Sequence, residues 1–405
     1  MQVPLFDNTR QFQALRAPLL ESLERVLVSG QYILGTEVES FEREAAEYLG
    51  VKHAIGVASG TDALWLALRA LGIGPSDRVL TTPFTFFATA SAILNTGAKP
   101  AFADIDPDSF NLSAREVRRV LEGQSATNER LGIRPDSIKA IIPVHLYGQA
   151  ADMDELMELS REYGLVVVED VAQAFGAEYK GVRVGGLGDL GCYSFFPTKT
   201  LGGFGDGGLV VTNNDNLADQ VRLLRSHGSR PKYYHHLSGG NSRLDAIQAT
   251  MLRVKLPYLD EWIQARQDHA SGYETELRNL AGLLTPYRAP HRTHTYHQHT
   301  IRVLHDERDE LQAFLKASGV GTEVYYPVPM HLQSALGSEG YRKGDFPNAE
   351  LACDEVLSLP IFPEMTVEER KYVTTRIVEY FATKRSNKKG SAQLSSSLPE
   401  LAISN

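Results

Sequence analysis

Residues 165–173 have the sequence LVVVEDVAQ, in which a near-continuous apolar run ends in an acidic pair. An apolar, β-branched run without polar alternation is typical of a strand in a parallel sheet that is covered on both faces. The pattern predicts further strands at residues 54–59, 79–82, 100–105, 140–146, 192–196 and 209–212, and helices at 61–71, 86–94 and 152–163. Repeated strand–helix–strand units predict an α/β fold whose mostly parallel sheet lies between layers of helices.

The chain has 405 residues, a length that suits a large domain and a smaller one. We expect the large domain at residues 1–255, although its first ~15 residues could pack on the other domain. A helical pattern starts at Arg243, with an apolar stripe that indicates core or dimer packing, and Pro257 should bend or restart it.

We expect the smaller domain at residues 256–384. Its pattern predicts a strand, a helix and a strand at residues 298–303, 309–318 and 323–326. Ser, Lys, Gln and Asn become frequent after Lys384, so residues 385–405 are expected to form a disordered tail.

Composition narrows the class of protein. Hydrophobic residues make up 42% and charged residues 22% of the chain, and the net charge is -9, so neither a nucleic-acid footprint nor a membrane span of ~20 apolar residues is expected. The N-terminus lacks the features of a signal peptide. Two distant cysteines, Cys192 and Cys353, indicate reduced thiols in a cytoplasmic protein.

The turn from the strand at residues 54–59 into the next helix contains Ser59, Gly60 and Thr61. Gly60 lets the backbone approach an anion closely, and a helix N-terminus presents free N–H groups. These residues fit a phosphate site. Taken alone, however, they fit an ordinary helix N-cap formed by Ser59 or Thr61 better.

Two charged residues also stand at the ends of predicted strands. Asp170 follows an apolar strand, where open α/β sheets bind ligands, although an Asp there could simply cap the next helix. Lys199 follows an aromatic strand and precedes a Gly-rich loop; it could be a Schiff-base lysine or an exposed loop lysine. A phosphate turn, then an acid at a strand end, then a lysine is the order of a pyridoxal-5′-phosphate (PLP) site in the aspartate-aminotransferase fold.

From about residue 4 to residue 383 the chain resembles the DegT/DnrJ/EryC1/StrS family of sugar aminotransferases. The motifs that carry this resemblance are GQYILG at residues 30–35, SGTDA at 59–63, PFTF at 83–86, EDVAQ at 169–173, SFFPTK at 194–199, GDGG at 205–208 and NSRLD at 241–245. It implies a fold type I PLP-dependent transferase, with a mostly parallel seven-stranded sheet and a smaller α+β C-terminal domain. Val171 and Thr198 depart from the family's usual residues without changing a group that the chemistry requires.

The resemblance also implies the roles of the site residues. Lys199 would bind the cofactor as a Schiff base and move the proton, while Asp170 would keep the pyridine nitrogen protonated. The implied cofactor contacts are Gln173 at the 3-oxygen, Phe86 on the ring face, Gly60, Thr61 and Ser194 at the phosphate, and Asn241 from a neighbouring subunit. The active unit would then be at least a homodimer with shared active sites.

Lys199 favours transamination, because dehydratases of the family carry histidine at this position. The implied acceptor is a nucleotide-diphosphate-linked keto sugar and the implied donor is L-glutamate, in the synthesis of an amino sugar for a lipopolysaccharide or an antibiotic. Residues 230–236 and 324–331 resemble members that aminate 3-keto sugars, so C3 is favoured over C4. The candidate substrate contacts are Tyr32, Lys232, Tyr234, His235, Tyr326 and His331.

Those polar residues could instead belong to an oligomer interface. The alternatives for the whole chain are a PLP-dependent sugar dehydratase and a non-catalytic regulator on the same fold, although no DNA-binding element is visible.

Two further patterns, a glycine motif and a cluster of histidines, do not indicate a functional site. Residues 186–191 match the dinucleotide fingerprint GxGxxG, but they lead into a strand instead of opening a helix. The histidines in the segment from His291 to His299 lack an acid or cysteine to complete a metal site. We therefore predict no metal, and interpret these histidines as part of a surface loop or hairpin.

Overall fold

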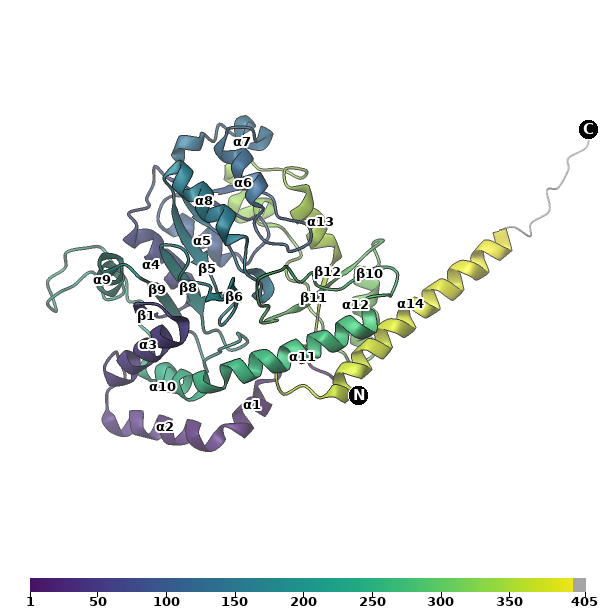
Figure 1. Ribbon diagram of the computed structural model, residues 1–405, viewed down its shortest axis with the longest axis horizontal. Coiled ribbons are helices and arrows are strands. Elements are labelled where there is room, and N and C mark those ends of the chain that lie inside the picture. Colours follow the sequence, from purple (N-terminus) through teal and green to yellow (C-terminus); the bar gives the residue numbers. More distant parts are fainter. Residues whose placement is uncertain (396–405) are drawn as a thin grey trace, which may run out of the picture.

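The computed structural model describes the backbone of residues 1–395 and the side chains of residues 1–385. Its centre is a seven-stranded sheet with the strand order β1-β9-β8-β5-β4-β2-β3 (Figure 1). The strands are β1 His53–Val57, β2 Arg78–Thr81, β3 Lys99–Phe102, β4 Ile138–Ile142, β5 Val166–Asp170, β8 Leu190–Ser194 and β9 Gly208–Thr212. Strand β9 is antiparallel to both neighbours and the other pairs are parallel, which confirms the predicted mostly parallel sheet.

Helices cover both faces of this sheet. On β5, Val167 belongs to one hydrophobic core and Val168 to another on the opposite face, as expected for a strand buried on both sides. The first core includes α3 (Thr36–Leu49), α6 (Ala114–Leu121), α8 (Met153–Tyr163) and α10 (Ala246–Lys255), and the second includes α4 (Gly60–Ala70), α5 (Ala88–Asn95) and α9 (Asp215–Leu224).

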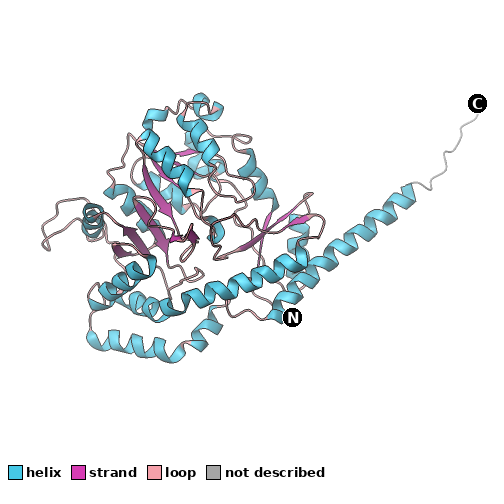
Figure 2. Ribbon diagram, viewed as in Figure 1, coloured by secondary structure: helices cyan, strands magenta, loops and turns pink. Residues whose placement is uncertain are grey.

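A smaller antiparallel sheet forms the C-terminal part of the protein, apart from the large sheet in Figure 2. Its strands are β10 Leu283–Leu284, β11 His299–Val303 and β12 Val356–Leu359, with α12 (Arg308–Ala317) and α14 (Val367–Ser395) beside them. Val3 packs into the same core and pairs with Val320, so the N-terminus lies on this part.

Helix α11 (Leu259–Leu277) connects the two parts, with Ile263 in a core of the large sheet and Tyr273 in the C-terminal core. Pro257 lies in a 3-10 turn between α10 and α11, which confirms that the helical pattern restarts there. Among residues 1–395, no helix combines the length and apolar character that crossing a membrane requires.

Two local predictions differ from the structure. The predicted strand at residues 323–326 is wrong: Glu323 makes only an isolated bridge to Ser358, because Pro327 and Pro329 cannot donate to a ladder. Helix α14 also continues through residues 385–395, where a disordered tail was predicted. This segment contains Lys, Ala and Gln, which favour helix, and no proline; the rest of the predicted tail, residues 396–405, lies outside the described residues.

The remaining elements are short or peripheral. They are α1 Asn8–Ala14, α2 Arg16–Ser29, α7 Ala126–Arg130, α13 Pro347–Glu355, β6 Glu178–Tyr179 and β7 Val182–Arg183.

Candidate active site

A cavity of about 530 Å³ lies beyond the carboxyl ends of β5 and β8, where open α/β sheets bind ligands. The structure brings most of the predicted cofactor contacts together in its wall. These are Gly60, Thr61, Phe86, Asp170, Gln173, Ser194 and Lys199. Tyr326, a predicted substrate contact, lines the same cavity.

One end of the cavity is formed by the N-terminus of α4. Ser59 caps this helix, because its Oγ accepts a hydrogen bond of 3.0 Å from the N–H of Asp62. The N–H groups of Gly60 and Thr61 lie in the first turn, where no helical carbonyl is available to them. A Cβ on Gly60 would lie 2.7 Å from Cβ of Ser194, so only glycine permits this close approach of helix and strand. The same turn can therefore cap the helix through Ser59 and bind an anion through the N–H groups of Gly60 and Thr61.

Asp170 ends β5 and is 5% exposed. Its Oδ2 accepts a hydrogen bond from Oγ1 of Thr89 at 2.9 Å, and its Oδ1 accepts one from the N–H of Ala172 at 3.1 Å. Burial raises the pKa of Asp170, whereas these two hydrogen bonds and the charge of Lys199 act in the opposite direction. The carboxylate is thus a charge held in one orientation, as the sequence predicts, and its bond to Ala172 also shapes the following turn.

Lys199 lies in the loop after β8, in the wall of the cavity. Burial lowers the pKa of Lys199 to about 8, and the charge of Asp170 opposes this shift. A substantial fraction of the amine is therefore neutral near physiological pH, which is the form that attacks a carbonyl carbon. This setting favours the Schiff-base lysine over the exposed loop lysine.

The side chain of Gln173 is fixed at both ends. Its Oε1 accepts a hydrogen bond of 2.7 Å from the N–H of Tyr147, and its Nε2 donates one of 2.8 Å to the hydroxyl of Tyr326. The ring of Tyr326 in turn lies 6.2 Å from that of Phe86, centroid to centroid. One N–H of the Gln173 amide remains available to a ligand in the cavity.

Glu169 is a fully buried carboxylate that the sequence analysis did not single out by itself. It accepts hydrogen bonds from the backbone N–H groups of Gly185, Leu187 and Gly188 at 2.7 to 2.8 Å, and it contacts Nε2 of His145 at 3.0 Å. The glycine-rich segment that matches the dinucleotide motif therefore binds a carboxylate of the protein itself. This explains the motif without a nucleotide.

Residues 13–378 match the sequence model of the DegT/DnrJ/EryC1/StrS aminotransferase family. The chain belongs to this family. It is therefore a PLP-dependent aminotransferase, which confirms the fold, the enzyme class and the cofactor predicted from the motifs.

Several relatives of this aminotransferase have names that bear on its function. It is 48% identical to the "pleiotropic regulatory protein" of Geobacillus stearothermophilus over 94% of this chain and 99% of that protein. It is 43% identical to the dTDP-3-amino-3,4,6-trideoxy-alpha-D-glucose transaminase of Streptomyces venezuelae, over 90% of this chain and 92% of that enzyme. The crystal structure of S. venezuelae DesV in complex with a ketimine intermediate superposes with a TM-score of 0.88 and 42% identity, covering 94% of this chain and 98% of that one.

The cavity of this aminotransferase fits PLP. The cradle between the start of α4 and Ser194, which a Cβ on Gly60 would fill, matches a phosphate group. The oriented carboxylate of Asp170 matches a protonated pyridine nitrogen, and Lys199 offers an amine for the aldehyde carbon. Phe86 lines the cavity where an aromatic ring would lie.

Several predicted residues of the aminotransferase do not line its own cavity. The segment between α9 and α10, at the left of Figure 1, extends away from the body of the protein and carries four of them. These are Lys232, Tyr234, His235 and Asn241, all of them exposed. Tyr32 is also outside the cavity, where its hydroxyl donates to the carbonyl of Leu27.

His331 is not brought to the cavity either. It is 2% exposed, its Nε2 lies 3.0 Å from Oε1 of Glu350, and its ring packs on Phe346. The apolar core beside α13 encloses this side chain, which the sequence named as a candidate substrate contact, so in the single chain it does not line the cavity.

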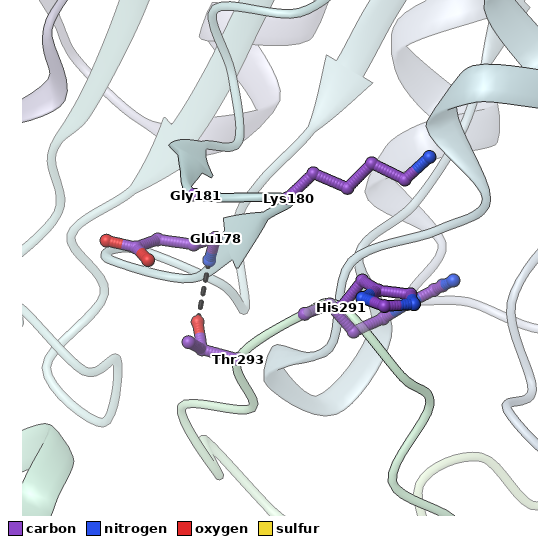
Figure 3. A pocket seen from close by; sticks show the side chains of 6 residues that line it. Glu178, Lys180, Gly181, His291 and Thr293 are labelled. Carbon is purple, nitrogen blue, oxygen red and sulfur yellow. Dashed lines mark hydrogen bonds between the residues drawn. The ribbon is translucent and has the colours of Figure 1, made fainter.

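The histidine-rich segment is not the surface loop that was predicted. His294, His297 and His299 are buried, because the segment packs against Gly148 and Tyr147 of the large part. His291, by contrast, is exposed and lines a surface hollow beside Lys180 and Thr293 (Figure 3). Within residues 1–385 no His, Cys, Asp or Glu side chains form a group of three that could hold a metal ion.

His297 was missed as a site residue. It lines the cavity with Lys199, although it comes from the segment before β11 in the C-terminal part. Gln298 and Tyr325 line the same wall. The signal for His297 in the sequence is the cluster of histidines, which suggests a metal site first and gives no sign that one of them lines a cavity.

Proposed function

We propose that the protein transfers the amino group of L-glutamate to C3 of a nucleotide-diphosphate-linked keto sugar. The observation that carries the proposal is the cavity whose wall contains both Lys199 and Asp170, each of which shifts the pKa of the other through its charge. The name of the S. venezuelae relative, a transaminase of a dTDP-3-amino sugar, supports both the sugar nucleotide and the C3 position. We place the reaction in amino-sugar biosynthesis in the cytoplasm, with which the two free, buried cysteines are compatible.

Lys199, Asp170 and Gln173 have separate roles in the proposed reaction. Bound PLP supplies the electron sink that makes the carbon next to the transferred nitrogen acidic. In its neutral form, Nζ of Lys199 would accept the proton from that carbon and donate it again on the other side of the transferred nitrogen. Asp170 holds a proton at the pyridine nitrogen, and Gln173 orients the ring through its free amide N–H.

The alternatives fit the site less well. A sugar dehydratase of this family would carry histidine in place of Lys199. A purely regulatory role has some support in the name of the G. stearothermophilus relative. However, a half-buried lysine with a lowered pKa, in one cavity with an oriented carboxylate, serves catalysis and has no evident use in a protein that only binds a partner.

We further propose that the active unit is a homodimer in which Asn241 completes the phosphate site of the other subunit. The segment that carries Asn241 projects from the body, and Tyr233 and Tyr234 on it are 77% and 66% exposed. Lys232 and His235 would then contact the substrate of the partner. Phe86 and Phe196 at the rim of the cavity are also more than half exposed in the single chain, as expected of a surface that a second subunit covers.

Mixing two inactive variants tests the shared site. Lys199→Ala lacks the amine and Asn241→Ala lacks the partner's contribution, so a mixed dimer contains one intact site if the proposal holds. We expect activity to return after the two variants are unfolded together and refolded. Mixtures that stay inactive, while wild type refolds with full activity, would contradict a shared site.

The position of amination is tested with a matched pair of substrates. The protein is incubated with PLP, L-glutamate and either a 3-keto or a 4-keto dTDP-6-deoxysugar, and the product is assigned by NMR. Amination at C3 is expected. Efficient amination at C4 with no reaction at C3 would contradict the proposed position and leave the aminotransferase class intact.

A further inference from the structure

His297 lies buried in the wall of the cavity, and one of its ring nitrogens, Nδ1, has no hydrogen-bond partner among the described residues. The residue is 9% exposed, and this nitrogen is itself buried. A buried polar group that stays unpaired is destabilising, because it has lost its hydrogen bonds to water without replacing them. The wall of the cavity therefore contains a ring nitrogen whose hydrogen-bonding capacity the described residues do not use.

The position of His297 is fixed relative to the cofactor residues. The N–H of Gln298 donates to the carbonyl of Tyr147 at 3.3 Å, and the N–H of Tyr147 donates to Gln173 at 2.7 Å. The backbone of Tyr147 thus binds both the side chain of Gln173 and the segment that carries His297. On the other side, the N–H of Thr295 donates to the carbonyl of Gly148 at 2.9 Å.

Close contact between these two segments depends on glycine. Gly148 has a φ of +107°, and a Cβ there would lie 2.4 Å from Oγ1 of Thr295. Arg266, buried in α11, adds a hydrogen bond from Nη1 to the carbonyl of Tyr296 at 3.2 Å. The backbone on both sides of His297 is therefore held against the large part, so the ring has little freedom to turn out of the wall.

The charge state of His297 limits what it can bind. Burial lowers the pKa of His297 well below its usual range, and the nearby charge of Lys199 acts in the same direction. The ring is consequently neutral at physiological pH, with one N–H donor and one acceptor nitrogen. Gln298, in the same wall, has a buried Oε1 that also lacks a partner.

These groups match a sugar better than a carboxylate. A carboxylate only accepts hydrogen bonds, so it would leave the acceptor nitrogen of His297 and Oε1 of Gln298 unpaired. A hydroxyl or amide group on a sugar carbon both donates and accepts. Among the described residues that line the cavity, Lys199 is the sole Lys or Arg, so no guanidinium is placed there to bind a carboxylate.

We propose that His297 hydrogen-bonds the hydroxyl or amide group next to the keto carbon of the sugar and so positions that carbon beside Lys199. This inference rests on the proposed function. It makes His297 a substrate-positioning residue for the sugar half-reaction, with no comparable part in the glutamate half-reaction.

The two half-reactions can be measured separately by absorbance on the PLP-loaded protein. L-Glutamate converts the PLP form to the pyridoxamine form, and the 3-amino sugar nucleotide drives the same conversion from the product side. For His297→Phe we expect kcat/KM with dTDP-3-amino-3,4,6-trideoxyglucose to fall roughly tenfold, mainly through KM, and the glutamate reaction to change less than about threefold. His297→Asn, which keeps a donor and an acceptor, should retain most of the sugar reaction.

Binding supplies a readout that does not depend on turnover. Calorimetry of the same sugar nucleotide with the pyridoxamine form should show a Kd that is roughly tenfold higher in His297→Phe than in wild type. Equal losses in both half-reactions would overturn the inference, because His297 would then act on the cofactor or on Lys199. An unchanged Kd would overturn it as well.

Failure of the proposed function has a different signature. Wild type that reacts with L-glutamate but neither binds nor converts the amino sugar nucleotide would refute the sugar substrate, and with it the role of His297. Wild type that fails with L-glutamate but reacts with the sugar would refute only the donor.

Discussion

Oγ1 of Thr89 donates a hydrogen bond of 2.9 Å to Oδ2 of Asp170. Thr89 is a fully buried residue of α5, and Asp170 ends β5, so the bond joins a helix to the strand end at the floor of the cavity. With the N–H of Ala172 on Oδ1, it leaves the carboxylate one orientation. The charge beneath the cofactor is therefore oriented by the protein before any ligand binds.

Thr89→Val should slow catalysis while the protein still binds PLP. The change keeps the shape of the side chain and removes a hydrogen bond to a carboxylate, worth about 1.5–3 kcal/mol, so the pKa of Asp170 should rise further. We expect the rate of the glutamate half-reaction to fall roughly tenfold or more. Thr375→Val on the exposed face of α14 is the matched control, and equal rates for the two variants would refute the role of Thr89.

Gly60→Ala should weaken the binding of PLP. The new Cβ would lie 2.7 Å from Cβ of Ser194, so the helix start and the strand end must separate at the predicted phosphate cradle. We expect the Kd for PLP, measured by absorbance or fluorescence titration, to rise at least about tenfold. Gly74→Ala, where the new Cβ meets nothing within 4 Å, should bind PLP like wild type. Unaltered affinity in Gly60→Ala would place the phosphate elsewhere.

The rate at which the cofactor-free protein takes up PLP should depend on the charge of Lys199. Burial lowers the pKa of this amine to about 8. Below that pH the amine is protonated and unreactive, so the rate should rise as the pH increases through about 8 and then level off. Because Asp170 opposes the shift, Asp170→Asn should move the midpoint to lower pH. If the rate in wild type keeps rising toward pH 10, the pKa of Lys199 is that of an ordinary exposed lysine and the prediction is wrong.

Loss of the Glu169 carboxylate should destabilise the large part. Glu169→Ala leaves three backbone N–H groups, including those of Gly185 and Gly188, and His145 without their acceptor in a fully buried place. We expect the free energy of unfolding in urea to fall by about 3–5 kcal/mol. Glu158→Ala on the exposed face of α8 should change it by less than about 0.5 kcal/mol. Similar values for the two variants would mean that the buried carboxylate contributes no stability.

Much of the lining of the candidate site could be predicted from the sequence, because its residues stand at the ends of strands. Gly60, Asp170 and Lys199 each stand where a strand passes into a turn, and parallel strands bring such turns to one edge of a sheet. Hydrophobic patterning likewise predicted the strands that this edge requires.

The rest depends on contacts between distant parts of the chain. Nothing near Thr89 in the sequence marks it as the partner of an acid 81 residues later. His297 enters the cavity from the C-terminal part through bonds to Gly148 and Tyr147, and local pattern placed it on a surface loop. Lys232 and Asn241 could be matched to motifs of the family, but in the single chain both are exposed and lie outside the cavity.

Transamination through Lys199 is tested most directly by the absorbance spectra of PLP-loaded wild type and Lys199→Ala before and after L-glutamate is added. Wild type should show the absorbance of the lysine-bound cofactor and convert to the pyridoxamine form. Lys199→Ala should lack the first absorbance and convert poorly. Wild type that binds no cofactor, or two proteins with the same spectra and conversion, would contradict the account.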